Sequence, residues 1–347
     1  MAAISWLLFL FGLNGLWAQA QPVKLPWDPR AITVDSKDNL YIEFERMLMK
    51  IGSDGNAVYV SENIAREFRG VVTPDAEIMI TDKADNIYMT RAGMTSIWKM
   101  EPGGRFSIHA APERYQNAWA APAPKPVDLV DIEFLAMGKN NLIYISSRYQ
   151  HSSTSVFYTL DADNHQQVIL DNKGDTVKIR HVTAIAAGPD GALYVASVHE
   201  RCIQKISREG SVTVVAGQCG KRDLCPVYKE GELSKAELVQ PGSMVFNSKG
   251  DLFFADERMN RIIRLSGGRI STVAGSSLIQ PCGSNMGGRS KEGYRDGKAM
   301  TALFNFPEKV RLAIDSKDNI YILDGGNNAI RKLTPGGMVS TVAINKN

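Results

Sequence analysis

The sequence predicts an all-β fold, a six-bladed β-propeller whose blades are four-stranded antiparallel sheets. The first observation is a short run with an aromatic side chain flanked by hydrophobic ones, which recurs six times. The second is a later run with a basic residue at a fixed position in five of the six copies. The third is a tight turn after each later run. Copies spaced by roughly 47 to 68 residues suit a blade with variable loops.

The clearest copy of the repeat is residues 306–343, near the end of the chain. It contains four short runs separated by the turn sequences SKDN, GGNN and TPGG, which is the layout of an antiparallel meander. A single meander cannot bury both of its faces, so neighbouring copies must cover it. A closed ring of such sheets accommodates all of residues 21–347 as a single domain.

Two positions recur in register along the copies. The aromatic of the second run is predicted to fill the core between blades, at Tyr41, Tyr88, Tyr144, Tyr194, Phe253 and Tyr321. The base of the third run is predicted to point outward and pair with acidic neighbours, at Lys50, Lys99, Lys205, Arg264 and Lys332. The alternative is a basic ring that attracts polyanions. Thr159 replaces this base in the third copy, the most divergent of the six.

In chain order, the predicted blades are residues 31–60, 78–110, about 130–170, 181–217, 240–275 and 306–343. A proline-rich stretch, residues 111–127, is predicted to be an extended surface loop. Two Gly-rich loops, residues 218–239 and 276–305, join blades four, five and six. Because the last blade has its own fourth strand, ring closure does not require an N-terminal strand, and residues 22–27 receive no assignment.

Residues 1–20 are predicted to be a secretory signal peptide, with a mature start at Gln21. The apolar core from Ile4 to Trp17 is short for a membrane span and ends in an Ala-x-Ala cleavage sequence, although the segment has no Lys or Arg. An uncleaved anchor is the alternative. We expect an exported protein, periplasmic or extracellular, with no membrane span after cleavage. The net charge of +3 and the lack of a contiguous basic block give no reason to expect a nucleic-acid partner; we expect a monomer.

The repeat motifs resemble those of a known family. The run D/N-x-x-G/D-N-[LI]-Y-[VI], the third-strand run [IL]-[RQ]-[KR]-[IL] and the sequence Ala302-x-Phe304-x-x-Pro307 are similar to NHL repeats, and the resemblance covers nearly all of residues 28–343. It implies a six-bladed propeller. Members and propeller relatives include protein-binding and RNA-binding modules, sensor ectodomains, an amidating lyase and calcium-dependent lactonases, so the resemblance does not select a function.

Aligning the first strands places one residue of each blade at the mouth of the central channel. The aligned residues are Asp28, Asp75, Asp131, His181, Gln240 and either Phe306 or Glu308. Carboxylate and amide oxygens suit Ca²⁺, and repulsion among the carboxylates favours a cation beside them. The sequence therefore offers a candidate calcium site, with the alternative that these residues cap strand ends and bind water.

The relatives also suggest a catalytic interpretation. The amidating lyase family holds zinc with histidines from three blades, and His151, His181 and His199 are predicted to share one face here. They lack ligand spacing, so solvated loop histidines are the simpler interpretation. The lactonases surround calcium with Glu, Asn and Asp, which the aligned residues do not match one to one. No Ser or Cys lies in a nucleophile motif with a partner His.

The four cysteines, Cys202, Cys219, Cys225 and Cys282, favour disulfides in an exported chain. Three pairings are open, and we favour Cys219–Cys225 with Cys202–Cys282. All four are predicted on the face that carries the inter-blade loops, where disulfides would order the loops.

Aromatic and imidazole side chains in loops of this face are the candidate ligand-binding residues, at Tyr115, Trp119, Tyr149 and His199. We expect a binding module for a protein, peptide or glycan on the inter-blade loop face. The alternative is a calcium- or zinc-dependent lactonase- or lyase-like enzyme at the channel mouth.

Overall fold

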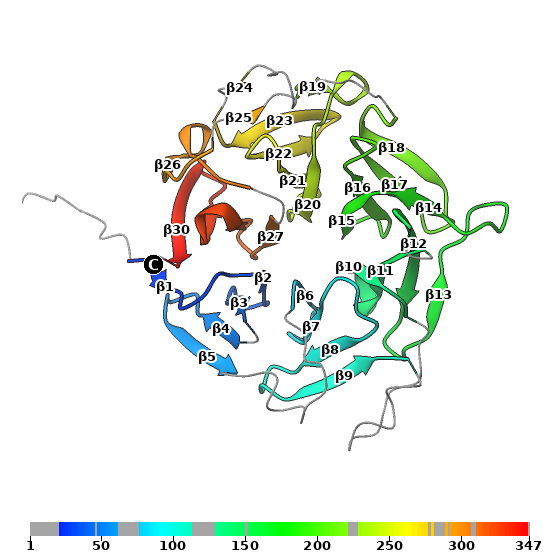
Figure 1. Ribbon diagram of the computed structural model, residues 1–347, viewed down its shortest axis with the longest axis horizontal. Helices are drawn as coiled ribbons and strands as arrows, with labels where there is room; N and C mark the ends of the chain where they lie inside the picture. Colours follow the sequence, from blue (N-terminus) through cyan, green and yellow to red (C-terminus); the bar gives the residue numbers. More distant parts are fainter. Residues whose placement is uncertain are drawn as a thin grey trace, which may run out of the picture.

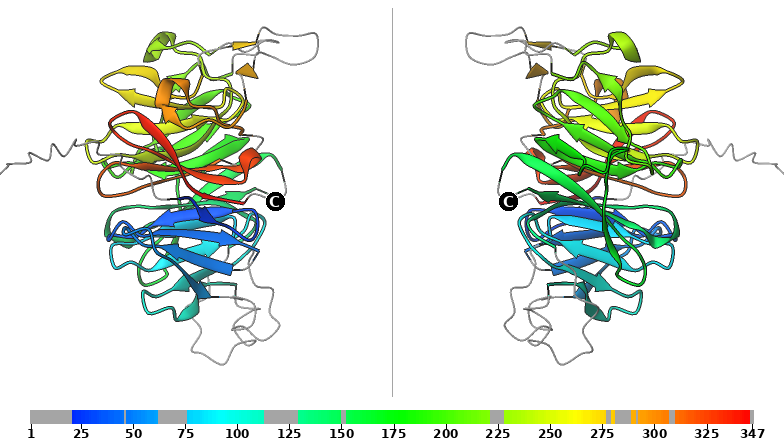
Figure 2. Two further views of the ribbon diagram at one scale, coloured as in Figure 1. Left: turned by 90° about the vertical axis from the view of Figure 1, so that its left-hand side faces the viewer. Right: turned by 90° about the vertical axis from the view of Figure 1, so that its right-hand side faces the viewer.

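The structure is a computed structural model, which describes residues 21–45, 47–61, 76–112, 129–149, 152–220, 228–276, 279–280, 289–290, 292–306 and 310–345. Six antiparallel sheets are arranged as a ring around a central axis (Figure 1), and seen edge-on the ring is a flattened disc (Figure 2). The predicted six-bladed propeller is confirmed. In the described residues no helix is long and apolar enough to cross a membrane. The predicted signal peptide, residues 1–20, lies outside the described residues.

Each blade is built from four successive strands, the first of which is innermost. Blades one and two are β2 (Ala31–Val34), β3 (Leu40–Phe44), β4 (Met47–Ile51), β5 (Ala57–Ser61), and β6 (Ile78–Thr81), β7 (Ile87–Thr90), β8 (Ile97–Met100), β9 (Phe106–Ala110). Blades three and four are β10 (Ile132–Met137), β11 (Ile143–Arg148), β12 (Thr154–Leu160), β13 (Gln166–Val168), and β15 (Val182–Ala187), β16 (Leu193–Ser197), β17 (Cys202–Ile206), β18 (Val212–Gly217). Blades five and six are β20 (Pro241–Phe246), β21 (Leu252–Asp256), β22 (Arg261–Ser266), β23 (Arg269–Ala274), and β27 (Arg311–Ile314), β28 (Ile320–Asp324), β29 (Ala329–Leu333), β30 (Met338–Ile344).

Short elements supplement the blades. The extra strands are β1 (Val23–Lys24), β14 (Lys178–Arg180), β19 (Gly231–Glu232), β24 (Ile279–Gln280), β25 (Arg289–Ser290) and β26 (Gly297–Lys298). The 3₁₀ turns are η3 (Lys139–Asn141), η4 (Leu233–Lys235), η5 (Ala299–Thr301) and η6 (Gly325–Asn327). In blade three, β13 and β14 both pair with β12, at opposite ends of it, so the outer edge of this blade is split between two strands.

The repeated aromatic is buried between blades in four of the six copies, as predicted, and is half-buried at Tyr194 and Phe253. The structure also shows how the tyrosine hydroxyl is satisfied. In blade one, Asp35 accepts hydrogen bonds from the Asn39 backbone and side-chain amides at 2.9 and 2.7 Å and from the Tyr41 hydroxyl at 3.3 Å. The same Asp, Asn and Tyr arrangement recurs in blades two and six. Burial, with the neighbouring Asp35 carboxylate, raises the pKa of Tyr41 to about 12.

The repeated base lies directly across the strand pair from this aromatic. The Lys50 ammonium is 5.8 Å from the centre of the Tyr41 ring, and Lys332 is 5.4 Å from that of Tyr321. Only Lys205, paired with Asp190 at 2.6 Å, shows the predicted ion pair among the described bases of this set. The fixed slot is therefore used mainly to cover a tyrosine.

Turns on the face opposite the inter-blade loops fasten four blades together. Ser316 of blade six donates its backbone N–H to Asp38 Oδ1 of blade one at 2.8 Å and its hydroxyl to Oδ2 at 3.0 Å. Ser36 repeats this contact on Asp85 of blade two, and Ser248 of blade five repeats it on blade six. We call these three contacts the serine–aspartate clips. They run from blade five through blades six and one to blade two, across the seam where the ring closes.

The N-terminus reinforces the same seam, which the sequence analysis did not anticipate. Strand β1 pairs in parallel with β30 on the outer edge of blade six, with Val23 opposite Ala343. Leu25, fully buried, packs in the core between blades six and one. The chain then continues into β2, the innermost strand of blade one. Blade six has its own four strands, as predicted, and β1 adds a further strand at its outer edge, so that residues 22–27 tie the last blade to the first.

Candidate ligand-binding face

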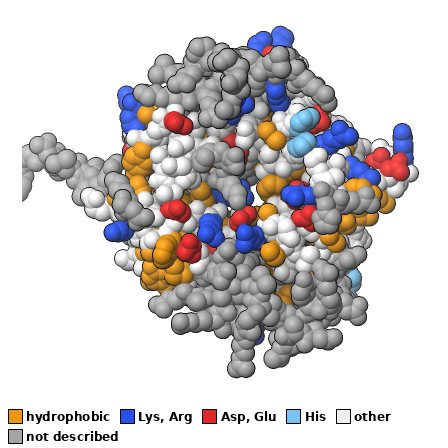
Figure 3. Space-filling view, viewed as in Figure 1, with side chains coloured by type: hydrophobic (Ala, Val, Ile, Leu, Met, Phe, Trp, Pro, Cys, Tyr) orange, Lys and Arg blue, Asp and Glu red, His pale blue; other side chains and the backbone are white. Residues whose placement is uncertain are grey.

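The face seen in Figure 1 carries the segments that join the blades and the loops between second and third strands. Side chains of both charge signs gather near the centre of this face (Figure 3). Beneath them, a cavity of about 320 Å³ follows the axis. It is lined by the innermost strand of every blade, at residues 32–34, 78–81, 134–137, 183–187, 243–246 and 311–314.

Arg311 at the start of β27 lies at the mouth of this channel. Its Nε donates to the carbonyl oxygen of Glu77, just before β6, at 3.0 Å. Glu257, which follows β21, accepts a hydrogen bond from the Gln240 side-chain amide at 2.8 Å. Burial raises the pKa of Glu257 to about 7, against the lowering effects of Gln240 and Arg311. A Cβ at residue 242 would lie 2.5 Å from Glu257 Oε1, so a larger residue in place of Gly242 would displace the Glu257 side chain.

Blade three adds a second set of charges at the mouth. The Arg148 Nε lies 3.3 Å from Glu133 Oε1 and 3.8 Å from Asp131 Oδ2. The Ser155 hydroxyl donates to the other oxygen of Glu133 at 2.5 Å. Carboxylates of this blade are therefore held by cations and hydroxyls of the same blade.

The predicted ring residues of blades three, four and five do occupy equivalent positions. The carbonyl oxygens of Asp131, His181 and Gln240 accept a backbone N–H at or just after the end of the second strand in each blade, at 2.9, 3.2 and 3.0 Å. Their side chains turn to neighbours in their own blades instead. Asp131 faces Arg148, the His181 ring stacks on His199 with centres 4.6 Å apart, and Gln240 contacts Glu257.

The remaining ring residues are dispersed or lie outside the described residues. Asp28 is exposed and accepts a hydrogen bond from Asn345 at 2.9 Å, at the seam between blades six and one. Asp75 and Glu308 lie outside the described residues. Within the described residues, three carboxylate or imidazole groups approach one another closely only at Asp161, Asp163 and His165, in a turn on the opposite face. The described ring residues do not form a ligand set by themselves, and the calcium site stays a prediction.

An exposed strip crosses the boundary between blades three and four on the loop face. Strand β14 pairs with the start of β12 and brings Lys178 to within 4.3 Å of the centre of the Tyr149 ring. His181 follows this strand, receives support from a backbone hydrogen bond to Ser153, and stacks on His199. Tyr149, His181 and His199 are all exposed. We call Tyr149, Lys178, His181 and His199 the aromatic strip.

The structure shows a disulfide between Cys202 and Cys219, with a Cα–Cα distance of 5.2 Å, so the pairing we favoured is wrong. The reason is strand register. Cys202 lies opposite Gly217 in the β17–β18 pair, so Cys219 comes back beside it only two residues later. The bond holds the base of the loop that carries His199. Cys225 and Cys282 lie outside the described residues, as do Tyr115, Trp119 and His151.

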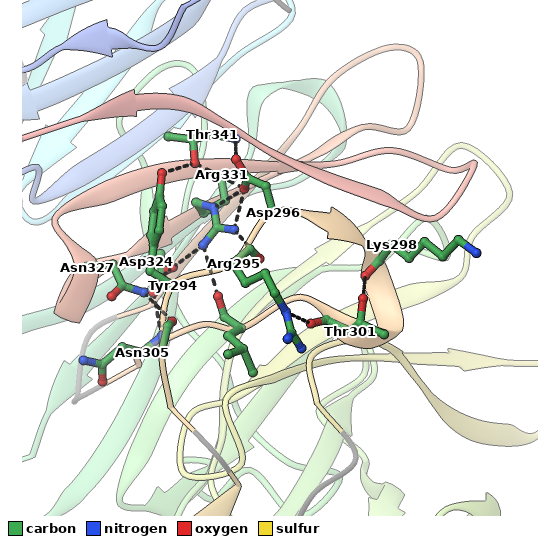
Figure 4. Close-up of polar contacts among 12 residues, drawn as sticks. Tyr294, Arg295, Asp296, Lys298, Thr301, Asn305, Asp324, Asn327, Arg331 and Thr341 are labelled. Atoms are coloured by element: carbon green, nitrogen blue, oxygen red, sulfur yellow. Dashed lines mark hydrogen bonds and ion pairs between the residues drawn. The ribbon is translucent and has the colours of Figure 1, made fainter.

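A buried guanidinium fixes the loop that enters blade six, and sequence reasoning missed it. Arg331, fully buried, uses all five of its N–H groups, on Asp296, Asp324 and the carbonyl oxygens of Arg295 and Leu303 (Figure 4). Its guanidinium also lies 4.7 Å from the centre of the Tyr294 ring.

The loop that enters blade five has the same framework. Glu230 accepts the backbone N–H of Thr272, as Asp296 accepts that of Thr341, and a tyrosine two residues earlier reaches the same threonine. The signal in the sequence is Tyr-x-acid-Gly, at Tyr228 and again at Tyr294. The described parts of these loops are therefore anchored to the outer strands of their blades.

No protein-family model and no curated protein matches this chain. Solved structures do. A structural genomics protein of unknown function from Bacteroides thetaiotaomicron has a TM-score of 0.62 at 15% identity, over 88% of this chain and 69% of its own. An auxiliary nutrient binding protein from the same organism has a TM-score of 0.59 at 18% identity, over 90% and 69%. A catalytically inactive virginiamycin B lyase from Staphylococcus aureus with quinupristin has a TM-score of 0.52 at 16% identity, over 93% and 88%. These likenesses show the fold, which binding proteins and enzymes share.

Proposed function

We propose that this chain is an exported propeller that binds a protein, peptide or glycan on its inter-blade loop face. The observation that carries the proposal is the aromatic strip. Tyr149 and His199 come from different blades, and β14 joins them through Lys178 and His181 into one exposed surface. Flat side chains with polar edges are well suited to stack on sugar rings or peptide groups and to donate hydrogen bonds at the same time.

Two further features support a binding role. The Cys202–Cys219 disulfide closes the base of the His199 loop, so less conformational entropy is lost when a ligand binds. A disulfide is also characteristic of exported proteins, consistent with the predicted signal peptide. An auxiliary nutrient binding protein among the structures with this fold provides a precedent for such a role.

The proposal is tested by screening the protein, with residues 1–20 removed, on glycan and peptide arrays, followed by calorimetry with each ligand found. We expect Tyr149→Ala and His199→Ala each to weaken binding by about tenfold or more, as for aromatic anchors at interfaces. Tyr59→Ser, which alters an exposed tyrosine on β5, is the matched control and should bind normally. Equal affinities for all three variants would refute the role of the strip.

The enzyme remains the second candidate because of Glu257. A carboxyl group whose pKa is raised to about 7 by burial, beside Arg311 at a channel mouth, is characteristic of catalytic acids and bases. Metal analysis, with melting in EDTA and after addition of Ca²⁺ or Zn²⁺, tests the metal-dependent version. Near-stoichiometric metal that is lost in Asp131→Ala would favour a lactonase- or lyase-like enzyme. If the protein contains no metal and its melting temperature does not change with EDTA, Ca²⁺ or Zn²⁺, the metal-dependent enzyme is ruled out.

A further inference from the structure

The opposite face of the ring contains a second cavity, of about 470 Å³, between blades three and four. Its walls are the ends of β11, β12 and β17 together with β13 and the turns beside them. This volume lies in the range of small-molecule sites. The cavity is on the far side of the disc from the aromatic strip, so it is independent of the function proposed above.

The cavity opens where the repeat is broken. Five copies place a long base opposite the second-strand aromatic, but blade three has Thr159 opposite Tyr144. The aspartate that accepts the tyrosine hydroxyl in blades one, two and six is replaced by Gly138, so Tyr144 donates instead to the Gly191 carbonyl oxygen of blade four at 2.9 Å. Blade three thus lacks both the base and the aspartate that blades one, two and six place beside this tyrosine.

Specific contacts with blade four hold the outer wall of this cavity. Residues 169–177 turn back from β13 and rest on blade four, where Gly210 lies so close to the Leu170 carbonyl oxygen that no side chain could replace its hydrogen. Gly210 also has a φ of 80°, which favours glycine. The Asn172 amide donates to the Ser211 hydroxyl at 3.1 Å and holds the same contact.

The chemistry of the lining indicates the kind of ligand. Leu142, Tyr144 and Ile206 provide apolar surface, and Lys139 and Arg208 bring two positive charges to the rim. Neither cation has an ion pair in the described part of the chain. The nearby carboxylates are already engaged, since Asp190 pairs with Lys205 at 2.6 Å and Asp161 accepts three hydrogen bonds within its own turn.

We propose that this cavity binds a small organic anion with a flat apolar body, whose acidic group lies between Lys139 and Arg208 and whose body packs on Tyr144. The Arg208 guanidinium lies against the backbone of Gly191, whose carbonyl oxygen accepts the Tyr144 hydroxyl, so the cation and the aromatic floor adjoin. Carboxylate, sulfonate and phosphate groups share the required charge.

The probes for the test are 1-anilinonaphthalene-8-sulfonate and its uncharged analogue N-phenyl-1-naphthylamine, measured by fluorescence titration of the folded protein. We expect one saturable site for the sulfonate. Thr159→Met, which restores the length of the missing lysine without its charge, should abolish binding of both probes. Arg208→Gln should weaken the sulfonate by about fivefold and leave the neutral analogue unchanged. Lys298→Gln, an exposed cation on blade six, is the control and should change neither titration.

Far-UV circular dichroism and melting of each variant keep the test decisive, because the sulfonate also binds partly unfolded chains. Arg208 is exposed, so its substitution should leave the fold intact even if Thr159→Met is poorly tolerated. The inference is overturned if wild type shows no saturable binding. It is equally overturned if both cavity variants bind like wild type, or if Tyr149→Ala removes the site instead.

Discussion

The clip between Ser316 and Asp38 makes a sharp prediction, because it crosses the seam where the last blade meets the first. Asp38 is 9% exposed and accepts the Ser316 backbone N–H, the Ser316 hydroxyl and the Lys317 ammonium at 2.8, 3.0 and 3.1 Å. Its φ of 62° suits Asp and Asn. The perturbation is therefore Asp38→Asn, which keeps the backbone conformation and removes the charge.

The hydrogen bonds of Asp38 set the expected loss in the free energy of unfolding. A hydrogen bond to a charged group contributes about 1.5–3 kcal/mol net, and asparagine keeps one acceptor for the Ser316 N–H. We therefore expect Asp38→Asn to lower the free energy of unfolding by about 2 kcal/mol. Asp85, which makes the same clip with Ser36 but is more exposed, is the matched control and should cost about 1 kcal/mol as asparagine.

The stability difference between wild type and Asp38→Asn should depend on pH. Burial raises the pKa of Asp38, but hydrogen bonds from Ser316 and Lys317 outweigh it and hold that pKa below the ordinary 3.8. A depressed carboxyl pKa contributes stability that is present above the unfolded value of 3.8 and is lost as pH falls through the folded value. The gap between wild type and Asp38→Asn should therefore close in acid.

The assay is guanidinium unfolding of wild type, Asp38→Asn, Ser316→Ala and the double variant at pH 7, with the first two repeated down to pH 3. A coupling energy of about 1 kcal/mol between the two positions is expected for residues in contact. A coupling of zero, or an Asp38 effect no larger than that of Asp85, would falsify the idea that this clip closes the ring.

The other predictions concern the supports of the face and the seam. Replacing Cys202 and Cys219 by Ala should cost about 3 kcal/mol in the free energy of unfolding, because the bond closes a loop with a separation of 17 residues; the same loss should follow reduction of wild type. Arg331→Ala should lower the free energy of unfolding by about 3–5 kcal/mol, because it leaves the fully buried Asp324 carboxylate without its cation. The double variant Arg331→Met with Asp324→Leu should recover part of this loss in the same unfolding assay. Deleting residues 21–25 should lower stability by about 2–3 kcal/mol through loss of buried Leu25, and hydrogen exchange should show its largest increase in β30.

Much of the fold could be predicted because the same strand pattern occurs six times in the sequence. A central aromatic, a turn and a cross-strand base in fixed register define second and third strands, and each copy checks the others. Strand β1 could not be found in this way. It has two residues, occurs once, and pairs in parallel with a strand more than 300 residues away, so no local periodicity marks it.

The site was predicted less completely because side-chain direction depends on neighbours that the repeat does not encode. Asp131, His181 and Gln240 occupy equivalent backbone positions, but each side chain contacts a polar partner at or just beyond the end of its own second strand. The disulfide was within reach of the sequence. Extending the register of the third and fourth strands of blade four places Cys219 beside Cys202 without any appeal to loop geometry.

The distribution of regular and irregular blades bears on where function lies. The clips join blades five, six, one and two, and three of these blades keep the repeated Asp, Asn and Tyr arrangement. Blades three and four lack a described clip between them. At this boundary Thr159 replaces the base opposite Tyr144, the Tyr144 hydroxyl donates to a backbone carbonyl and not to an aspartate, and the outer edge of blade three is split between two strands. A deviation from the repeat that does not help the chain to fold is expected at positions that a function requires. Both the aromatic strip and the second cavity lie at this one boundary, on opposite faces, which makes blades three and four the first place to look for what this propeller binds.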